Sequence, residues 1–143
     1  MVFELKTLKD TENLAKKFST QLKEKDLVLL KGDLGSGKTT FVKFLVKSLG
    51  SPQDNVSSPS FTIVQEYIFE GKTIYHIDLY RIEKEDELFE IGLEEILNGD
   101  SLVIVEWPDV GKIFFETCGR RIFRINFDFK DGKRRVNLTN LDI

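Results

Sequence analysis

The glycine-rich segment at residues 32–39 is the strongest chemical signal in this sequence. It reads Gly-Asp-Leu-Gly-Ser-Gly-Lys-Thr and matches the phosphate-loop (Walker A) pattern GxxxxGK(S/T). Its glycines let successive backbone N–H groups converge on phosphate oxygens at the start of a helix. Lys38 adds a positive charge for the phosphates, and Thr39 offers a hydroxyl to Mg²⁺. The expected nucleotide-binding residues here are Gly32, Asp33, Leu34, Gly35, Ser36, Gly37, Lys38, Thr39 and Thr40.

Two carboxylates, Asp78 and Glu106, each end a short apolar segment and are candidates to complete this site. A magnesium nucleotide needs a carboxylate near the phosphate-loop hydroxyl, usually at the carboxyl end of a neighbouring strand. One carboxylate would hold the metal or its waters, and the other would orient an attacking water. The spacing of the two residues leaves open which one has which role.

Two aromatic residues lie beside these carboxylates. Trp107 is the only tryptophan and directly follows Glu106, so we expect it at the lip of the site, with core packing as the alternative. His76 is the only histidine and lies two residues before Asp78. A lone histidine in a strand is more often structural than catalytic, and we interpret His76 in that way.

The polar segment 51–60 reads as an exposed loop that follows the phosphate-loop helix. In many phosphate-loop proteins a segment at this position depends on the γ-phosphate for its order. Thr62 or Ser60 is therefore a candidate sensor of the terminal phosphate, and a turn or capping role is equally open. Cys118, the only cysteine, excludes an intramolecular disulfide and is interpreted as structural.

Apolar periodicity predicts one α/β domain that spans residues 1–143, with alternating helices and strands around these motifs. The expected elements are a helix at 10–25 capped by Asp10 or Thr11, a buried strand at 27–31, a helix at 40–49, antiparallel strands at 61–69 and 73–80 joined by a turn at 70–72, one or two acidic helices within 83–98, a buried strand at 101–108, and a hairpin within 120–141 that turns at Asp131-Gly132.

Composition narrows the classes of partner. The 143 residues carry a net charge of −3, which disfavours nucleic acid as a direct, sole partner. Residues 1–110 have a net charge of −7 and residues 111–143 one of +4, so the basic hairpin is either a solvated edge or a contact surface. No apolar run has a membrane-span length and the start lacks a signal-peptide layout, so we expect a cytoplasmic protein without a membrane partner.

Four segments in this order, GDLGSGKTTF, SPSFT, HIDLYR and VEWP, resemble the bacterial TsaE (YjeE) family. The resemblance implies a P-loop NTPase fold with a mainly parallel central sheet flanked by helices, added antiparallel strands and a C-terminal hairpin. It also implies an ATPase that works with the TsaB and TsaD proteins in threonylcarbamoyladenosine modification of tRNA at position 37. Contact with tRNA would occur through that complex, and the oligomeric state is left open.

The same resemblance implies individual roles. Lys38 would bind phosphate, Thr39 and Glu106 would bind Mg²⁺, and Asp78 would be needed for hydrolysis of ATP. Trp107 is expected beside the nucleotide. Residues near Thr7 and Leu8, and Lys133 in the hairpin, are further candidates to approach the nucleotide.

Two other functions stay open at this point. A nucleotide-gated binding switch would use hydrolysis only as a reset, and a small-molecule kinase would need a lid with several arginines. The kinase is disfavoured because Arg81 is the only arginine between the phosphate loop and residue 120. Arg81 is also the only arginine near a catalytic motif in the sequence, so we expect slow hydrolysis by the isolated protein.

Overall fold

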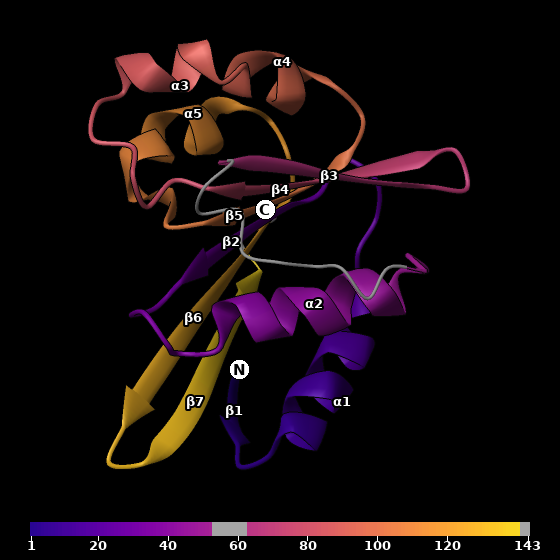
Figure 1. The fold of residues 1–143 in the computed structure, drawn as a ribbon, viewed down its shortest axis with the longest axis vertical. Helices are drawn as coiled ribbons and strands as arrows, with labels where there is room; N and C mark the ends of the chain where they lie inside the picture. The colour runs from indigo at the N-terminus through magenta and orange to yellow at the C-terminus, as the bar shows by residue number, and fades with distance from the viewer. Residues whose placement is uncertain (53–62, 141–143) are drawn as a thin grey trace.

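Seven strands form one mixed sheet in the computed structural model, which describes residues 1–52 and 63–140 (Figure 1). Their order across the sheet is β1-β7-β6-β2-β5-β4-β3. The strands are β1 (Val2–Leu5), β2 (Leu27–Lys31), β3 (Val64–Phe69), β4 (Lys72–Asp78), β5 (Leu102–Glu106), β6 (Ile122–Lys130) and β7 (Lys133–Asn140). The helices are α1 (Leu8–Ser19), α2 (Lys38–Ser48), α3 (Asp86–Glu90), α4 (Leu93–Asn98), the 3₁₀ helix η1 (Pro108–Gly111) and α5 (Lys112–Thr117).

The centre of the sheet is parallel and its edges are antiparallel. Strands β6, β2, β5 and β4 run parallel to one another, whereas β7 and β1 on one side and β3 on the other add antiparallel pairs. The two apolar strands β2 and β5 are buried almost throughout, as expected for strands covered on both faces. The predicted α/β class with a mainly parallel central sheet is therefore confirmed.

Helices cover both faces of the sheet (Figure 1). Helices α1 and α2 pack on one face, where Phe18 makes an edge-to-face contact with Phe123 at 5.2 Å between ring centroids. Helices α3, α4 and α5 pack on the other face through Leu88, Leu93 and Phe115. Among the described residues, no helix has the length and apolar character that a membrane span requires.

Helix α1 begins and ends earlier than the sequence predicts. Its N-cap is Thr7, whose hydroxyl accepts a hydrogen bond from the backbone N–H of Asp10, so the expected cap at Asp10 or Thr11 is wrong. Asp10 instead accepts from the backbone N–H of Thr7, which completes a capping box. At the other end, the hydroxyls of Ser19 and Thr20 donate to main-chain carbonyls one turn earlier, which favours termination there rather than at residue 25.

Both predicted hairpins are present, but the first has a shorter turn than expected. Phe69 pairs with Lys72, so the loop consists of Glu70 and Gly71 alone, both in the left-handed region. The second hairpin turns at Asp131-Gly132 as predicted, also with positive φ at both residues. The predicted strand at 101–108 ends at Glu106, and the first two residues of the one predicted at 61–69 lie outside the described residues.

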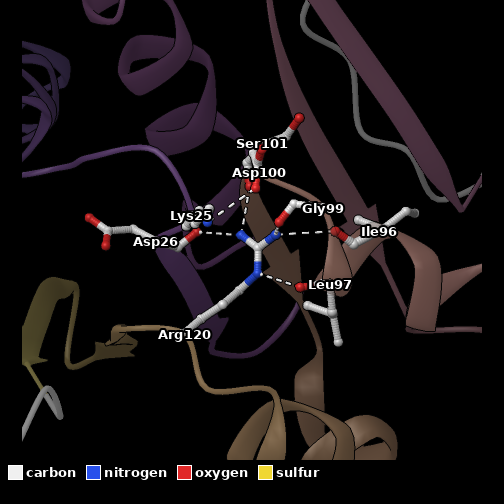
Figure 2. A network of polar contacts seen from close by, with 8 residues as sticks. All are labelled: Lys25, Asp26, Ile96, Leu97, Gly99, Asp100, Ser101 and Arg120. Carbon is white, nitrogen blue, oxygen red and sulfur yellow. Dashed lines mark hydrogen bonds and ion pairs between the residues drawn. The ribbon is translucent and has the colours of Figure 1, made fainter.

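Arg120 anchors the chain at the amino ends of the central strands (Figure 2). Its guanidinium donates hydrogen bonds to five main-chain carbonyls, those of Asp26, Ile96, Leu97, Gly99 and Ser101. The last carbonyls of an α-helix lack partners within it, and at the end of α4 the Ile96 carbonyl also accepts from the backbone N–H of Gly99. Arg120 thus acts as a C-terminal cap of α4 and links it to the residues that directly precede β2 and β5. The neighbouring Arg121 forms a two-point ion pair with Asp26 at 3.0 and 2.6 Å.

Candidate functional site

The candidate residues meet at the carboxyl edge of the parallel strands. Glu106 at the end of β5 is in register with Leu30 of β2 on one side and with Asp78 of β4 on the other. The phosphate loop begins at Gly32, directly after Lys31, the last residue of β2, so it starts at the same edge of the sheet. In open α/β sheets, ligands bind outside the carboxyl ends of the strands, and the sequence places its chemical residues there.

The phosphate loop depends on its glycines for conformation and for space. Gly32 has φ of +149°, and a Cβ there would lie 2.6 Å from the carbonyl oxygen of Phe127, so a larger residue would clash with β6. Gly35 and Gly37 also have positive φ, and a Cβ on either would meet no atom within 4 Å. Both glycines line a cavity at this edge of the sheet.

Helix α2 starts directly after this loop, with Gly37 as its N-cap and no side-chain capping hydrogen bond. The first N–H groups of a helix have no partners within it, so those of α2 can donate to an anion. Ser36 lies just before them, and its hydroxyl oxygen is buried with no hydrogen-bond partner. A bound phosphate oxygen would satisfy both kinds of group.

A cavity of about 220 Å³ opens at this edge of the sheet. It brings together the phosphate loop, both carboxylates, Trp107, the start of α1 and the C-terminal hairpin. Its lining residues are Leu5, Leu8, Thr11, Leu34, Gly35, Ser36, Gly37, Lys38, Thr39, Thr40, Asp78, Tyr80, Glu106, Trp107, Phe127 and Arg134.

Lys38 is buried in the wall of this cavity although its side chain is cationic. Its Nζ donates to the carbonyl oxygen of Gly32 and lies 3.7 Å from the ring centroid of Trp107. Burial lowers the pKa of Lys38 from its usual range, and the negative charges of Glu106 and Asp78 oppose that shift. A phosphate group would give the buried ammonium a further counter-charge, so the site favours an anionic ligand.

Glu106 is held between the phosphate loop and the interior. The hydroxyl of Thr39 donates to Glu106 Oε1 at 3.3 Å, and His76 Nε2 lies 2.6 Å from Glu106 Oε2. Behind His76, the Tyr67 hydroxyl lies 3.2 Å from Nδ1. Burial and the negative charge of Glu106 raise the pKa of Tyr67 to about 12. The interpretation of His76 as purely structural is therefore incomplete, because His76 directly contacts Glu106, the candidate Mg²⁺ ligand.

Asp78 has different contacts from Glu106. Its Oδ1 accepts a hydrogen bond from the backbone N–H of Tyr80 at 2.9 Å, which orients the carboxylate at the end of β4. The Tyr80 ring packs on Trp107 with 4.8 Å between the centroids. Trp107 has φ of +57°, an uncommon value for a large residue, and its backbone N–H donates to the carbonyl oxygen of Leu30. Trp107 thus lines the cavity as expected.

The other candidates from the sequence differ in their relation to the cavity. Thr62 and Ser60 lie outside the described residues, so their predicted role is untested. Gly32 and Asp33 belong to the loop but do not line the cavity, and neither does Lys133. Leu8, expected near the nucleotide, does line it. Cys118 donates through Sγ to the carbonyl oxygen of Phe115 and packs against the apolar core under α3, α4 and α5, consistent with a structural role.

The arginine at the cavity is Arg134 rather than Arg81. Arg81 is exposed after β4 and does not line the cavity, whereas Arg134 reaches it from β7. Arg134 also lies 5.3 Å from the ring centroid of Phe129. The expectation that Arg81 is the only arginine near the motifs is wrong in space, because the hairpin returns to the edge where the phosphate loop begins. Sequence alternation within the hairpin could have shown that Lys133 and Arg134 point to opposite faces.

Comparisons with known proteins show which family the chain resembles. The family model described as "Threonylcarbamoyl adenosine biosynthesis protein TsaE" matches residues 5–136. A protein of Rickettsia prowazekii named "tRNA threonylcarbamoyladenosine biosynthesis protein TsaE" is 44% identical over 132 residues, which are 92% of this chain and 89% of that protein. One of the same name from Haemophilus influenzae is 39% identical and covers 80% of this chain and 72% of its own length.

A solved structure shows the same fold. The crystal structure of Bacillus subtilis YdiB superposes with a TM-score of 0.71 and 28% sequence identity, covering 99% of this chain and 86% of that chain. The family match spans the phosphate loop, both carboxylates and Arg134. The chain therefore belongs to the TsaE family of tRNA threonylcarbamoyladenosine biosynthesis proteins.

Proposed function

We propose that this protein is a Mg²⁺-dependent ATPase that acts with the TsaB and TsaD proteins in tRNA threonylcarbamoyladenosine synthesis. The observation that carries the proposal is the meeting of Lys38, Thr39, Asp78 and Glu106 around one cavity. ATP is preferred over GTP because the sequence contains no Asn-Lys-x-Asp motif for guanine. In this proposal the whole chain acts as one domain, and a role on tRNA gives the cytoplasm as its expected location.

The residues present fit a magnesium nucleotide. The unpaired hydroxyl of Ser36 and the open space beside Gly35 and Gly37 suit a phosphate group. Thr39 and Glu106 offer oxygen ligands 3.3 Å apart, which is the chemistry that Mg²⁺ prefers. Within residues 1–52 and 63–140, no group of three or more His, Cys, Asp or Glu side chains could hold a metal ion. Mg²⁺ in nucleotide sites is typically held by one or two protein oxygens, with phosphate and water completing its shell.

Each residue then has a defined task in the hydrolysis of ATP to ADP and phosphate. Lys38 and the N–H groups of α2 hold the phosphates, and Thr39 with Glu106 would hold Mg²⁺. When bound, Mg²⁺ neutralises the phosphate charge. Asp78, whose carboxylate is oriented by the backbone N–H of Tyr80, accepts a hydrogen bond from the attacking water and takes up its proton. As the water oxygen bonds to the γ-phosphorus, the bond from that phosphorus to the β–γ bridging oxygen breaks and ADP leaves with the bonding electrons.

Slow turnover is expected of the protein alone. An arginine that reaches the transition state accelerates phosphoryl transfer by about 10³ to 10⁵-fold. Arg134 lines the cavity, but it is exposed and packs near Phe129, so it is not fixed by burial. We therefore propose that the TsaB–TsaD pair orders the site or adds charge to it.

The test is Mg²⁺-dependent phosphate release from ATP, measured for the protein alone and with TsaB and TsaD. Slow release that rises with the pair and disappears in Lys38→Ala is the expected result. Release that is unchanged by the pair contradicts partner activation, and release that persists in Lys38→Ala contradicts the site itself. Magnesium dependence is tested in the same assay by replacing MgCl₂ with EDTA.

A further inference from the structure

The two carboxylate oxygens of Glu106 have different partners. Oε1 accepts a hydrogen bond from Thr39 at the phosphate loop, whereas Oε2 lies 2.6 Å from His76 Nε2. Glu106 is only 2% exposed and His76 is not exposed at all, so water does not compete for this contact. Because each oxygen of this buried carboxylate contacts a different side chain, those two side chains determine its orientation.

His76 has a second contact that defines the role of its ring. Its Nδ1 lies 3.2 Å from the Tyr67 hydroxyl, and the two rings stack with 6.1 Å between the centroids. A tyrosine hydroxyl is protonated at neutral pH, so Tyr67 can donate to Nδ1. When Nδ1 accepts, Nε2 carries the ring proton and donates it to Glu106 Oε2.

Strand pairing places these three side chains next to one another. Tyr67 lies on β3 and His76 on β4, which form the antiparallel hairpin, and β4 pairs in parallel with β5, which carries Glu106. Ile104 of β5 is the register partner of His76, so the imidazole lies one side-chain step from Glu106 on the same face. The three side chains therefore belong to three adjacent strands.

We propose that His76 is a positioning residue that holds the Glu106 carboxylate so that Oε1 faces Thr39 and the metal position, with Tyr67 fixing the imidazole. The inference rests on the proposed magnesium nucleotide site and deepens it. Partners that orient a metal ligand without touching the metal typically change metal affinity by about 10- to 100-fold when removed. A histidine that served packing alone would not affect magnesium affinity.

The test measures magnesium affinity rather than turnover. A fluorescent ADP analogue is titrated onto the protein at increasing MgCl₂ concentrations and, separately, in EDTA. His76→Leu removes the N–H donor, whereas His76→Gln places an amide N–H near the position of Nε2. We expect the magnesium concentration for half-maximal tightening to rise about 10-fold or more in His76→Leu and to return toward the wild-type value in His76→Gln. Affinity in EDTA should stay within about twofold in both variants, because the phosphate loop is unchanged.

The outcomes separate the inference from the function on which it rests. If the wild-type protein binds the analogue equally well in MgCl₂ and EDTA, the proposed magnesium site and this inference both fail. If wild-type binding depends on Mg²⁺ and folded His76→Leu has the same magnesium requirement, the positioning role is overturned while the site stands. An equal loss in His76→Leu and His76→Gln also overturns it, because the restored donor would then have no effect.

A milder variant covers the case in which His76→Leu does not fold. Tyr67→Phe removes only the hydroxyl that orients the imidazole, and we expect it to raise the magnesium requirement by about threefold or more. An unchanged requirement in folded Tyr67→Phe, together with unfolded His76→Leu, overturns the inference.

Because His76 is the only histidine, ¹⁵N-histidine NMR of the untagged chain reports one imidazole. A slowly exchanging Nε2–H signal that moves on addition of Mg²⁺ with ADP is expected, and an unprotonated Nε2 contradicts the proposal.

Discussion

Asp78 and Glu106 are register partners at the carboxyl ends of the adjacent parallel strands β4 and β5. The two acids thus occupy equivalent positions on the same face of the sheet, yet their contacts differ. Glu106 touches Thr39 and His76, whereas Asp78 accepts from the backbone N–H of Tyr80. These different partners suit the proposed division of roles, in which Glu106 holds Mg²⁺ and Asp78 takes up a proton from the attacking water.

Asp78→Asn is expected to reduce phosphate release by about 10²- to 10⁴-fold, because the amide cannot take up a proton from water. Asparagine retains Oδ1 as an acceptor for the Tyr80 N–H, so the fold and nucleotide affinity should remain. Phosphate release and binding of a fluorescent ADP analogue are measured side by side. Full tRNA modification by the reconstituted system with Asp78→Asn would instead favour a nucleotide-gated switch.

Arg134→Gln is expected to weaken ATP binding by about three- to fivefold, since an exposed charge contact contributes up to about 1 kcal/mol. Lys133→Gln is the matched control: it removes the same charge from the adjacent residue, which does not line the cavity. Equilibrium titrations at low and high salt check this, because screening should reduce the difference. A larger loss in Lys133→Gln would restore the interpretation drawn from sequence.

Arg120→Met is expected to lower the free energy of unfolding by about 2 to 4 kcal/mol, because main-chain carbonyls lose a charged donor. Five carbonyls share this guanidinium (Figure 2). Arg124→Met is the control, because Arg124 has a weaker contact with Glu116 at 3.9 Å and should change stability by about 0.5 kcal/mol or less. Urea unfolding measures both, and equal effects would contradict the anchoring role.

Tyr67 is expected to make the protein less stable at high pH. Its pKa is about 12 in the folded chain, whereas an unperturbed tyrosine has a pKa of about 10. Between these two values the unfolded chain therefore loses a proton that the folded chain keeps. The unfolded state then binds fewer protons, and stability falls as the pH rises from about 10 to 12. Urea unfolding across this range should show a smaller decline in Tyr67→Phe. An identical decline in both proteins would contradict the assigned pKa.

The apolar pattern was sufficient to predict an α/β domain with buried central strands. Residues 27–31 and 102–106 are nearly continuous apolar runs, which indicate strands covered on both faces. The mainly parallel arrangement of the central sheet was implied by the resemblance to the TsaE family and not by these runs alone. Strand β1 escaped prediction because it has four residues and depends on pairing with β7, far along the chain. Helix α5 escaped because its six residues show too little periodicity.

The site was predictable only in part. Lys38 and Thr39 follow from a local motif, and strand ends place Asp78 and Glu106 at one edge of the sheet. Their partners come from tertiary contacts that spacing does not encode: Tyr67 reaches His76 across a hairpin, and Arg134 enters the cavity because β7 folds back beside β1. Side chains from strands that are distant in sequence can be assigned to the site only when the order of strands in the sheet is known.

The pairing of β1 with β7 has a consequence for the order in which the protein becomes able to bind its ligand during synthesis. A growing chain that has reached residue 110 already contains the phosphate loop and both acids, but β1 still lacks its neighbour in the sheet. Leu5 of β1 and Arg134 of β7 are register partners in this pairing, and both line the cavity. The part of the cavity wall that Leu5 and Arg134 form therefore requires the C-terminal hairpin to have been synthesised and paired with β1.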